Sequence, residues 1–123
     1  MLGPIPAYGL YARNMRGLTA TNMRFQTASA DLRPAVILDR VIDAVFNQIS
    51  VDANRQAESA LRFVNCTDVL LVSPRLLNET ATLLQLEGPN TERIILDGCD
   101  TTRAASPVVF RDGATSASIR IRD

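Results

Sequence analysis

A short apolar pattern recurs five times along the chain at nearly constant intervals. Each occurrence has an apolar residue, an intervening residue and a second apolar residue, and successive occurrences begin 26, 25, 23 and 24 residues apart. The five occurrences are residues 10–12, 36–38, 61–63, 84–86 and 108–110. A unit of this length buries its apolar side chains only against a neighbouring unit, so the period restricts the chain to stacked-repeat architectures.

Two further apolar sets follow within each repeat, the second about eight residues after the first. In the first four repeats the second set comprises Leu18 and Ala20, Ala44 and Phe46, Val69 and Leu71, and Ile94, Ile95 and Leu96, and the final repeat closes with Ile119 and Ile121. The third comprises Met23 and Phe25, Ile49 and Val51, and Leu76. The polar turn residues between the sets are Asn14 and Gly17, Arg40 and Asp43, Asn65 and Asp68, Gly88 to Asn90, and Asp112 and Gly113. Each repeat therefore reads as three short alternating strands.

These spacings predict an all-β fold, a right-handed parallel β-helix (a solenoid) of about five short coils. Residues 1–7 would cover the N-terminal coil, and residues 8–123 would form a single β-helix domain. Pro34 and Pro107 would each precede a first strand, where a missing N–H group costs little. A β-sandwich is the alternative fold. A leucine-rich repeat has a similar period, but its Leu-x-x-Leu-x-Leu-x-x-Asn pattern is absent from the sequence.

The composition excludes several functions. The chain has 13 arginines, no lysine, 13 carboxylates and no histidine, so its net charge is zero. This balance argues against nucleic-acid binding, and no apolar run approaches the roughly 20 residues that span a membrane. Without histidine, the chain cannot build a Ser-His-Asp site or the commonest zinc site. Cys66 and Cys99 form no CxxC motif, and no glycine-rich phosphate loop occurs, so we expect no metal and no cofactor. Buried free thiols are the favoured state of the two cysteines, and a disulfide is the alternative.

Three segments carry a family resemblance: GPIPAYGLYARNMRGL (residues 3–18), RPAVILD (residues 33–39) and LQLEG (residues 84–88). They resemble the C-terminal coils of bacterial polygalacturonase-like glycoside hydrolases, right-handed parallel β-helices that act on pectic polysaccharides. The resemblance extends from about Gly3 to Arg103. The basic or histidine residue that the family usually has after its tyrosine-containing strand is Asn14 here.

The catalytic motifs of that family are missing from this sequence. The family uses an Asn-Thr-Asp motif, an Asp-Asp pair, a Gly-His-Gly motif and an Arg-Ile-Lys motif, and none of these occurs here. Arg120-Ile121-Arg122 is no substitute, because it stands on the last coil without those partners. The resemblance therefore implies the part of such an enzyme that follows the active site, and no catalytic residue can be carried over.

Few residues are candidates for a site. Tyr8 and Tyr11 could stack on a sugar ring, although packing of one on the first coil and solvent exposure of the other is the simpler interpretation. Asp97 and Asp100 flank Gly98 and could form a carboxylate pair, but ordinary turn residues are favoured.

Charged residues recur at outward positions, and the four phenylalanines fall at inward positions. The charged examples are Arg13, Asp39, Arg62 and Glu87; they could bind an acidic polymer, but a solvated, charge-balanced face is the favoured interpretation. Phe25, Phe46, Phe63 and Phe110 are predicted to belong to the core. Truncation of Arg62 should therefore cost little, as it does at exposed positions.

The sequence favours a non-catalytic, structural β-helix module that self-associates. The predicted C-terminal coil ends in a strand pattern with Ile119 and Ile121 uncovered, so the expected partner is a second copy, joined through exposed coil ends. The alternatives are part of a hydrolase acting on pectic polysaccharide and a weak binding module for acidic polysaccharide. The localisation stays open: the family that the chain resembles is typically secreted or periplasmic, and no signal peptide is visible in the first eight residues.

Overall fold

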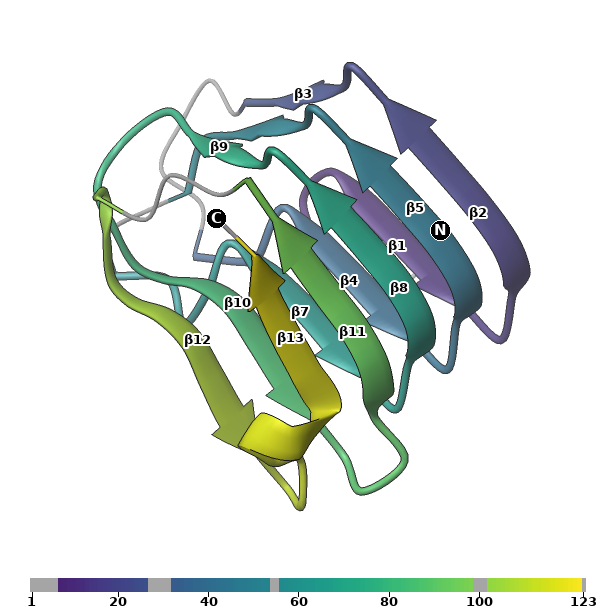
Figure 1. Ribbon diagram of the computed structural model, residues 1–123. Coiled ribbons are helices and arrows are strands. Elements are labelled where there is room, and N and C mark those ends of the chain that lie inside the picture. Colours follow the sequence, from purple (N-terminus) through teal and green to yellow (C-terminus); the bar gives the residue numbers. More distant parts are fainter. Residues whose placement is uncertain (1–6, 27–31, 54–55, 99–101, 123) are drawn as a thin grey trace, which may run out of the picture.

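The structure, a computed structural model, describes residues 7–26, 32–53, 56–98 and 102–122. Within these ranges it contains β-strands and one short 3-10 helix, η1 (Ser116–Ser118), and no α-helix. The strands form three sheets, named here sheets A, B and C, and neighbouring strands are parallel throughout. In Figure 1, sheet B lies in front of sheet A, and sheet C closes the top.

The order of the strands shows that the chain visits the sheets in turn. Sheet A contains β1 (Leu10–Arg13), β4 (Val36–Asp39), β7 (Leu61–Val64), β10 (Thr80–Glu87) and β12 (Ala104–Arg111). Sheet B contains β2 (Arg16–Thr21), β5 (Ile42–Asn47), β8 (Thr67–Val72), β11 (Glu92–Asp97) and β13 (Ile119–Arg122). Sheet C contains β3 (Arg24–Phe25), β6 (Ser50–Val51) and β9 (Arg75–Leu76). The chain thus makes four turns from β1 to β12 and begins a fifth, which confirms the predicted parallel β-helix.

The register places equivalent residues of successive coils side by side. In sheet A the chain of partners is Leu10, Val36, Leu61, Leu84 and Val108. In sheet B it is Leu18, Ala44, Val69, Ile94 and Ile119. The sheet A column and the first four members of the sheet B column are the apolar sets that the sequence repeat predicts, and Ile119 of the final repeat continues the sheet B column. The interior therefore consists of stacked columns of like residues.

Inward side chains fill the space between the sheets. Phe46 and Phe63 are fully buried, and their rings stack with centroids 6.2 Å apart. Phe25 is also buried, which confirms its predicted core position. Phe110 is only half-buried and packs against the core, because β12 is an edge strand of sheet A and has no described strand on its outer side.

Residues with positive φ make the bends between the strands, and they recur at equivalent positions of successive coils, so they form columns. One column follows the strands of sheet A: Asn14, Arg40, Asn65, Gly88 and Asp112. A second occupies the second residue of sheet B strands: Gly17, Asp43, Asp68 and Arg93. A third follows the strands of sheet B: Asn22, Gln48, Ser73 and Gly98. Most turn residues indicated by the sequence fall in the first two columns, the exceptions being residues 89, 90 and 113. Gly, Asn and Asp tolerate the left-handed conformation best.

Three details differ from the sequence expectations. Pro107 lies inside β12 rather than before it, which is tolerated because β12 is an edge strand of sheet A. Sheet C has no strand from the fourth coil in the described residues, whereas β10 and β12 each extend to 8 residues. Of the predicted cover segment, residues 1–6 lie outside the described residues, and Ala7 is buried. In the part that the structure describes, no helix is long and apolar enough to cross a membrane.

Two glycines with positive φ provide a matched test of this stacking. A Cβ atom on Gly88 (φ +96°) would lie 2.0 Å from the Asn65 side-chain oxygen of the preceding coil, whereas one on Gly17 (φ +83°) would have no neighbour within 4 Å. We expect Gly17→Ala to cost about 1 kcal/mol of unfolding free energy, from backbone strain alone. Gly88→Ala should cost roughly 2–3 kcal/mol, because Asn65 is also displaced from its hydrogen bond. Denaturant unfolding measures both, and equal losses would contradict coil-on-coil packing at this corner.

Candidate functional site

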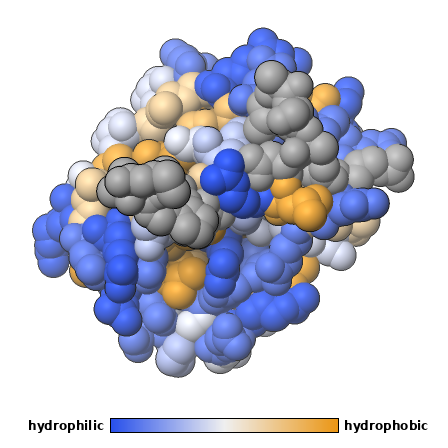
Figure 2. Space-filling model, turned by 180° about the vertical axis from the view of Figure 1, so that it is seen from behind, coloured by the Kyte–Doolittle hydropathy of each residue, from blue (hydrophilic) through white to orange (hydrophobic). Residues whose placement is uncertain are grey.

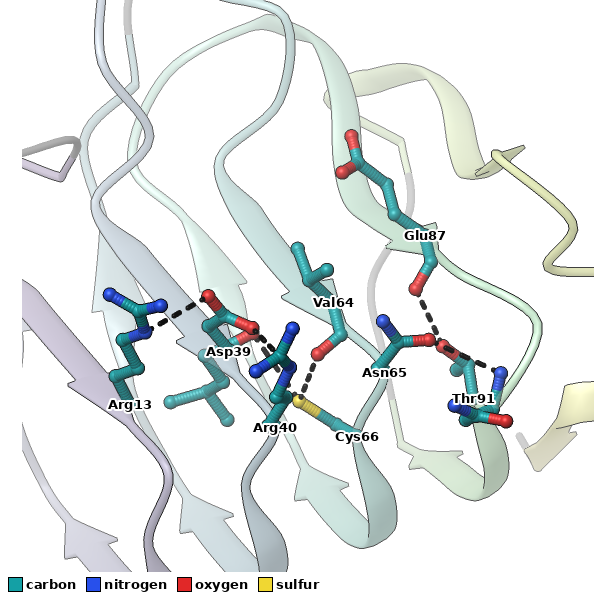
Figure 3. Close-up of polar contacts among 10 residues, drawn as sticks. Arg13, Asp39, Arg40, Val64, Asn65, Cys66, Glu87 and Thr91 are labelled. Carbon is teal, nitrogen blue, oxygen red and sulfur yellow. Dashed lines mark hydrogen bonds and ion pairs between the residues drawn. The ribbon is translucent and has the colours of Figure 1, made fainter.

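The corner where sheet A turns into sheet B carries a row of polar contacts between coils (Figure 3). Asp39 forms ion pairs with Arg13 at 3.7 Å and with Arg40 at 3.9 Å. The backbone N–H of Asn90 donates to the Asn65 side-chain oxygen at 3.2 Å. Arg40 occupies the place between Asn14 and Asn65 in the turn column, so these two amides do not form a continuous ladder. The Arg13–Asp39 and Asn90–Asn65 contacts tie the turns of successive coils to one another, whereas the Asp39–Arg40 pair lies within one coil.

Cys66 lies beneath this corner as a buried free thiol. Its Sγ atom is 3.3 Å from the carbonyl oxygen of Leu38 and 3.4 Å from that of Val64. Burial raises the pKa of the Cys66 thiol to about 11. The thiol is therefore neutral at physiological pH and inaccessible, which excludes it as a nucleophile. Cys99 lies outside the described residues.

The outer face of sheet A holds a more deeply placed polar cluster. Arg62 Nη2 donates to Glu87 Oε2 at 2.7 Å, and the Gln85 side-chain amide donates to the other oxygen of Glu87. The Glu87 side chain is 8% exposed and that of Arg62 is 35% exposed. The hydrogen bond to Glu87 is the main cause of the raised pKa of Arg62. The alternation in the sequence correctly predicts that Arg62 points outward, but it does not predict the ion pair between Arg62 and the nearly buried Glu87.

The cluster has the features of a structural ion pair. Both oxygens of Glu87 accept hydrogen bonds, so this carboxylate is held in place rather than available to a substrate. Two buried atoms of the cluster, Gln85 Oε1 and Arg62 Nε, have no hydrogen-bond partner. They come from neighbouring residues in the register of β7 and β10.

Seen from behind, the surface is mainly hydrophilic, with hydrophobic residues in separate areas (Figure 2).

The two tyrosines predicted as a weak carbohydrate site occupy different environments. Tyr8 is half-buried against the core, and its hydroxyl bonds to the carbonyl oxygens of Phe25, at 3.1 Å, and Asp52. Tyr11 is 39% exposed on the outer face of sheet A, in register with Ile37. Only Tyr11 therefore offers a ring toward solvent, and sugar binding there stays a prediction.

The candidate carboxylate pair is not brought together by described residues. Asp97 is half-exposed at the end of β11, with one carboxylate oxygen 4.0 Å from Arg122 Nη1. Asp100 lies outside the described residues. Within the described ranges, no group of three or more Cys, Asp or Glu residues could hold a metal ion.

A groove on the outer face of sheet B was not predicted. Its volume is about 540 Å³. Three equivalent residues of each strand line it: residues 43–45 of β5, 68–70 of β8 and 93–95 of β11. The left-handed residues Asp43, Asp68 and Arg93 stand along one side, and Val45, Leu70 and Ile95 along the next row. Arg93 Nε donates to Asp68 at 2.6 Å, which lowers the pKa of Asp68. The sequence signal that could have located this side of the groove is the recurrence of Gly17, Asp43, Asp68 and Arg93 at the same position of successive repeats.

The end coils expose members of columns that are otherwise interior. Met15 and Met23 of the first coil are 41% and 39% exposed, while Val41 and Ile49, their equivalents one coil later, are fully buried. Ile121 of β13 is 53% exposed, while its partner Leu96 is fully buried. The interior thus reaches the surface at both ends of the described solenoid.

The Arg62–Glu87 pair yields a test against Arg13, another arginine in an ion pair on the same face. Arg62→Ala should cost roughly 2–3 kcal/mol of unfolding free energy, because it leaves a buried carboxylate without its charged partner. Arg13→Ala should cost less than about 1 kcal/mol, since the Arg13 side chain is 57% exposed, the Asp39 side chain is 25% exposed against 8% for Glu87, and Asp39 keeps Arg40 as a second partner. Adding Glu87→Gln to Arg62→Ala should restore part of the loss. Equal small losses at Arg62 and Arg13, measured by urea unfolding, would show that Glu87 needs no partner.

Comparison with protein-family models, with curated proteins and with solved structures finds no match for this chain. The assignment of the fold therefore rests on the strand order and register. The polygalacturonase-like resemblance rests on the sequence segments alone. Any function must be argued from the surfaces described above.

Proposed function

We propose that this chain is a non-catalytic structural module, a short β-helix that self-associates through its end coils. The observation that carries the proposal is the exposure of interior columns at the ends, through Met15, Met23 and Ile121. No large apolar side chain is exposed in the described residues of the third and fourth coils, 61–97, whereas Ile42 of the second coil is 37% exposed. Apolar surface of this kind usually marks an interface.

A second copy of the chain is the partner that fits these ends. β12 and β13 are edge strands, so each presents unpaired backbone groups on its outer side. The first coil of another copy carries the same in-and-out alternation and strands of both sheets, β1 in sheet A and β2 in sheet B. Its backbone can therefore continue the sheets while its apolar columns cover Ile121 and the neighbouring residues. A closed dimer or trimer removes these edges, whereas an open stack leaves two of them.

The polygalacturonase-like origin belongs to this proposal. It is supported by the segments at residues 3–18, 33–39 and 84–88 and by a fold of the same kind. The absence of that family's catalytic motifs from the sequence supports a structural rather than a hydrolytic role. The ion-paired state of Glu87 is consistent with such a role.

Light scattering after size-exclusion chromatography tests self-association. At micromolar concentration we expect a mass that is a multiple of the 13.4 kDa chain. Ile121→Gln should shift the equilibrium toward the single chain by roughly tenfold or more, because it removes an apolar contact of about 1.5–3 kcal/mol. Ile42→Gln is the control, since Ile42 is also exposed, at 37%, but lies on the second coil.

The proposal fails under either of two results. One is a single species near 13.4 kDa that is unchanged by concentration. The other is an equal effect of Ile42→Gln and Ile121→Gln, which would indicate general surface stickiness rather than association through the end coil.

A further inference from the structure

Two adjoining grooves lie at the corner between sheets B and C. Their volumes are about 370 and 290 Å³, and both are lined by Ser73 and Arg75. The corner is formed by the third left-handed column, in which Asn22, Gln48 and Ser73 each follow a strand of sheet B. Figure 1 shows this corner at the top of the molecule, where β8 leads into β9.

Three arginines line these grooves and no described lining residue is acidic. Arg24 and Arg75 lie in one row of sheet C with Ser50 between them, and Arg103 lines the second groove beside Arg75. Two strand spacings separate Arg24 from Arg75, which corresponds to about 10 Å. In a chain of zero net charge, this is a local excess of positive charge.

The guanidinium groups of this row are available to a ligand. All three arginines are exposed. Within the described ranges the side chains of Arg24 and Arg75 form no hydrogen bond or ion pair, and the side chain of Arg103 donates one N–H to the carbonyl oxygen of Leu77 at 3.3 Å. The hydroxyl groups of Ser50 and Ser73 line the same grooves. The corner therefore presents a row of hydrogen-bond donors beside the exposed side chain of Met23.

The donors favour a tetrahedral oxyanion over a carboxylate. Arg75, Arg103 and Ser73 meet in one groove, and two guanidinium forks offer more donors than one carboxylate can accept. A sulfate ester presents three terminal oxygens and stays fully charged across the physiological pH range. Arg24, about 10 Å further along, would bind a second such group on the same polymer. Nucleic acid fits less well, because no aromatic side chain of the described residues lines the grooves for base stacking.

We propose that this corner binds an extended sulfated polysaccharide, with Arg75 and Arg103 holding one sulfate ester and Arg24 holding another. The contacts are charge-assisted hydrogen bonds from guanidinium groups at the surface. Binding should therefore weaken as salt rises, since exposed charges are screened.

Titration of the full chain with heparin, followed by calorimetry, tests the proposal at low and at physiological salt. The triple variant Arg24→Gln/Arg75→Gln/Arg103→Gln should bind heparin at least tenfold more weakly. The control triple Arg16→Gln/Arg111→Gln/Arg120→Gln removes the same charge from exposed arginines outside the two grooves and should change affinity less than threefold. Circular dichroism and the thermal midpoint should be unchanged in both, which separates binding from folding.

Two competitors distinguish the sources of the anion. Inorganic sulfate and polygalacturonate, a polymer that carries only carboxylates, should each compete at least tenfold less effectively than heparin at equal anion concentration. Competition by inorganic sulfate as strong as that by heparin would contradict a polymeric ligand. Competition by polygalacturonate as strong as that by heparin would contradict the preference for sulfate over carboxylate. Equal losses in the two triple variants, or no binding of heparin by the unmodified chain, would overturn the site itself.

Discussion

Parallel hydrogen bonding between successive coils is the constraint on which the rest of the structure depends. Each strand of sheets A and B pairs in register with its equivalent one coil away, so a residue is stacked on its own counterpart. Apolar residues therefore form continuous interior columns, and left-handed bends form columns at the corners. Every surface feature inherits this geometry, including the ion-paired corner, the groove on sheet B and the arginine row on sheet C.

Much of the fold could be predicted because residues one repeat apart pair with each other, so the repeat itself indicates which residues are neighbours. The period of 23 to 26 residues and the alternation around Leu61 and Phe63 determine strand positions, register and side-chain direction together. The turn residues were also predictable, because Asn65, Asp68 and Gly88 belong to types that tolerate positive φ. For Arg40 the repeat rather than the residue type was the guide, whereas Arg93, which stands in the second column, was not among the predicted turn residues.

The candidate site was less predictable, because it depends on which particular side chains bond to each other across coils. The sequence shows that Arg62 points outward, but not that its partner is a nearly buried Glu87 on the next coil. It likewise shows the two tyrosines, but not that the hydroxyl of Tyr8 bonds to carbonyl oxygens from two different coils. The two grooves bring together Arg24 and Arg75 of sheet C and Arg103, which precedes β12. These arginines are far apart in sequence and share no local sequence motif.

Amide hydrogen exchange tests coil-on-coil pairing most directly, because it measures the protection of each strand separately. The account predicts the slowest exchange in β5 and β8, which have a paired coil on both sides, and faster exchange in the edge strand β13. The measurement should be made on the Ile121→Gln variant at low protein concentration, where association is weakest. Protection in β13 equal to that in β5 and β8 would contradict a solenoid that ends in an open edge. Loss of protection in β5 and β8 would contradict the stacked coils themselves.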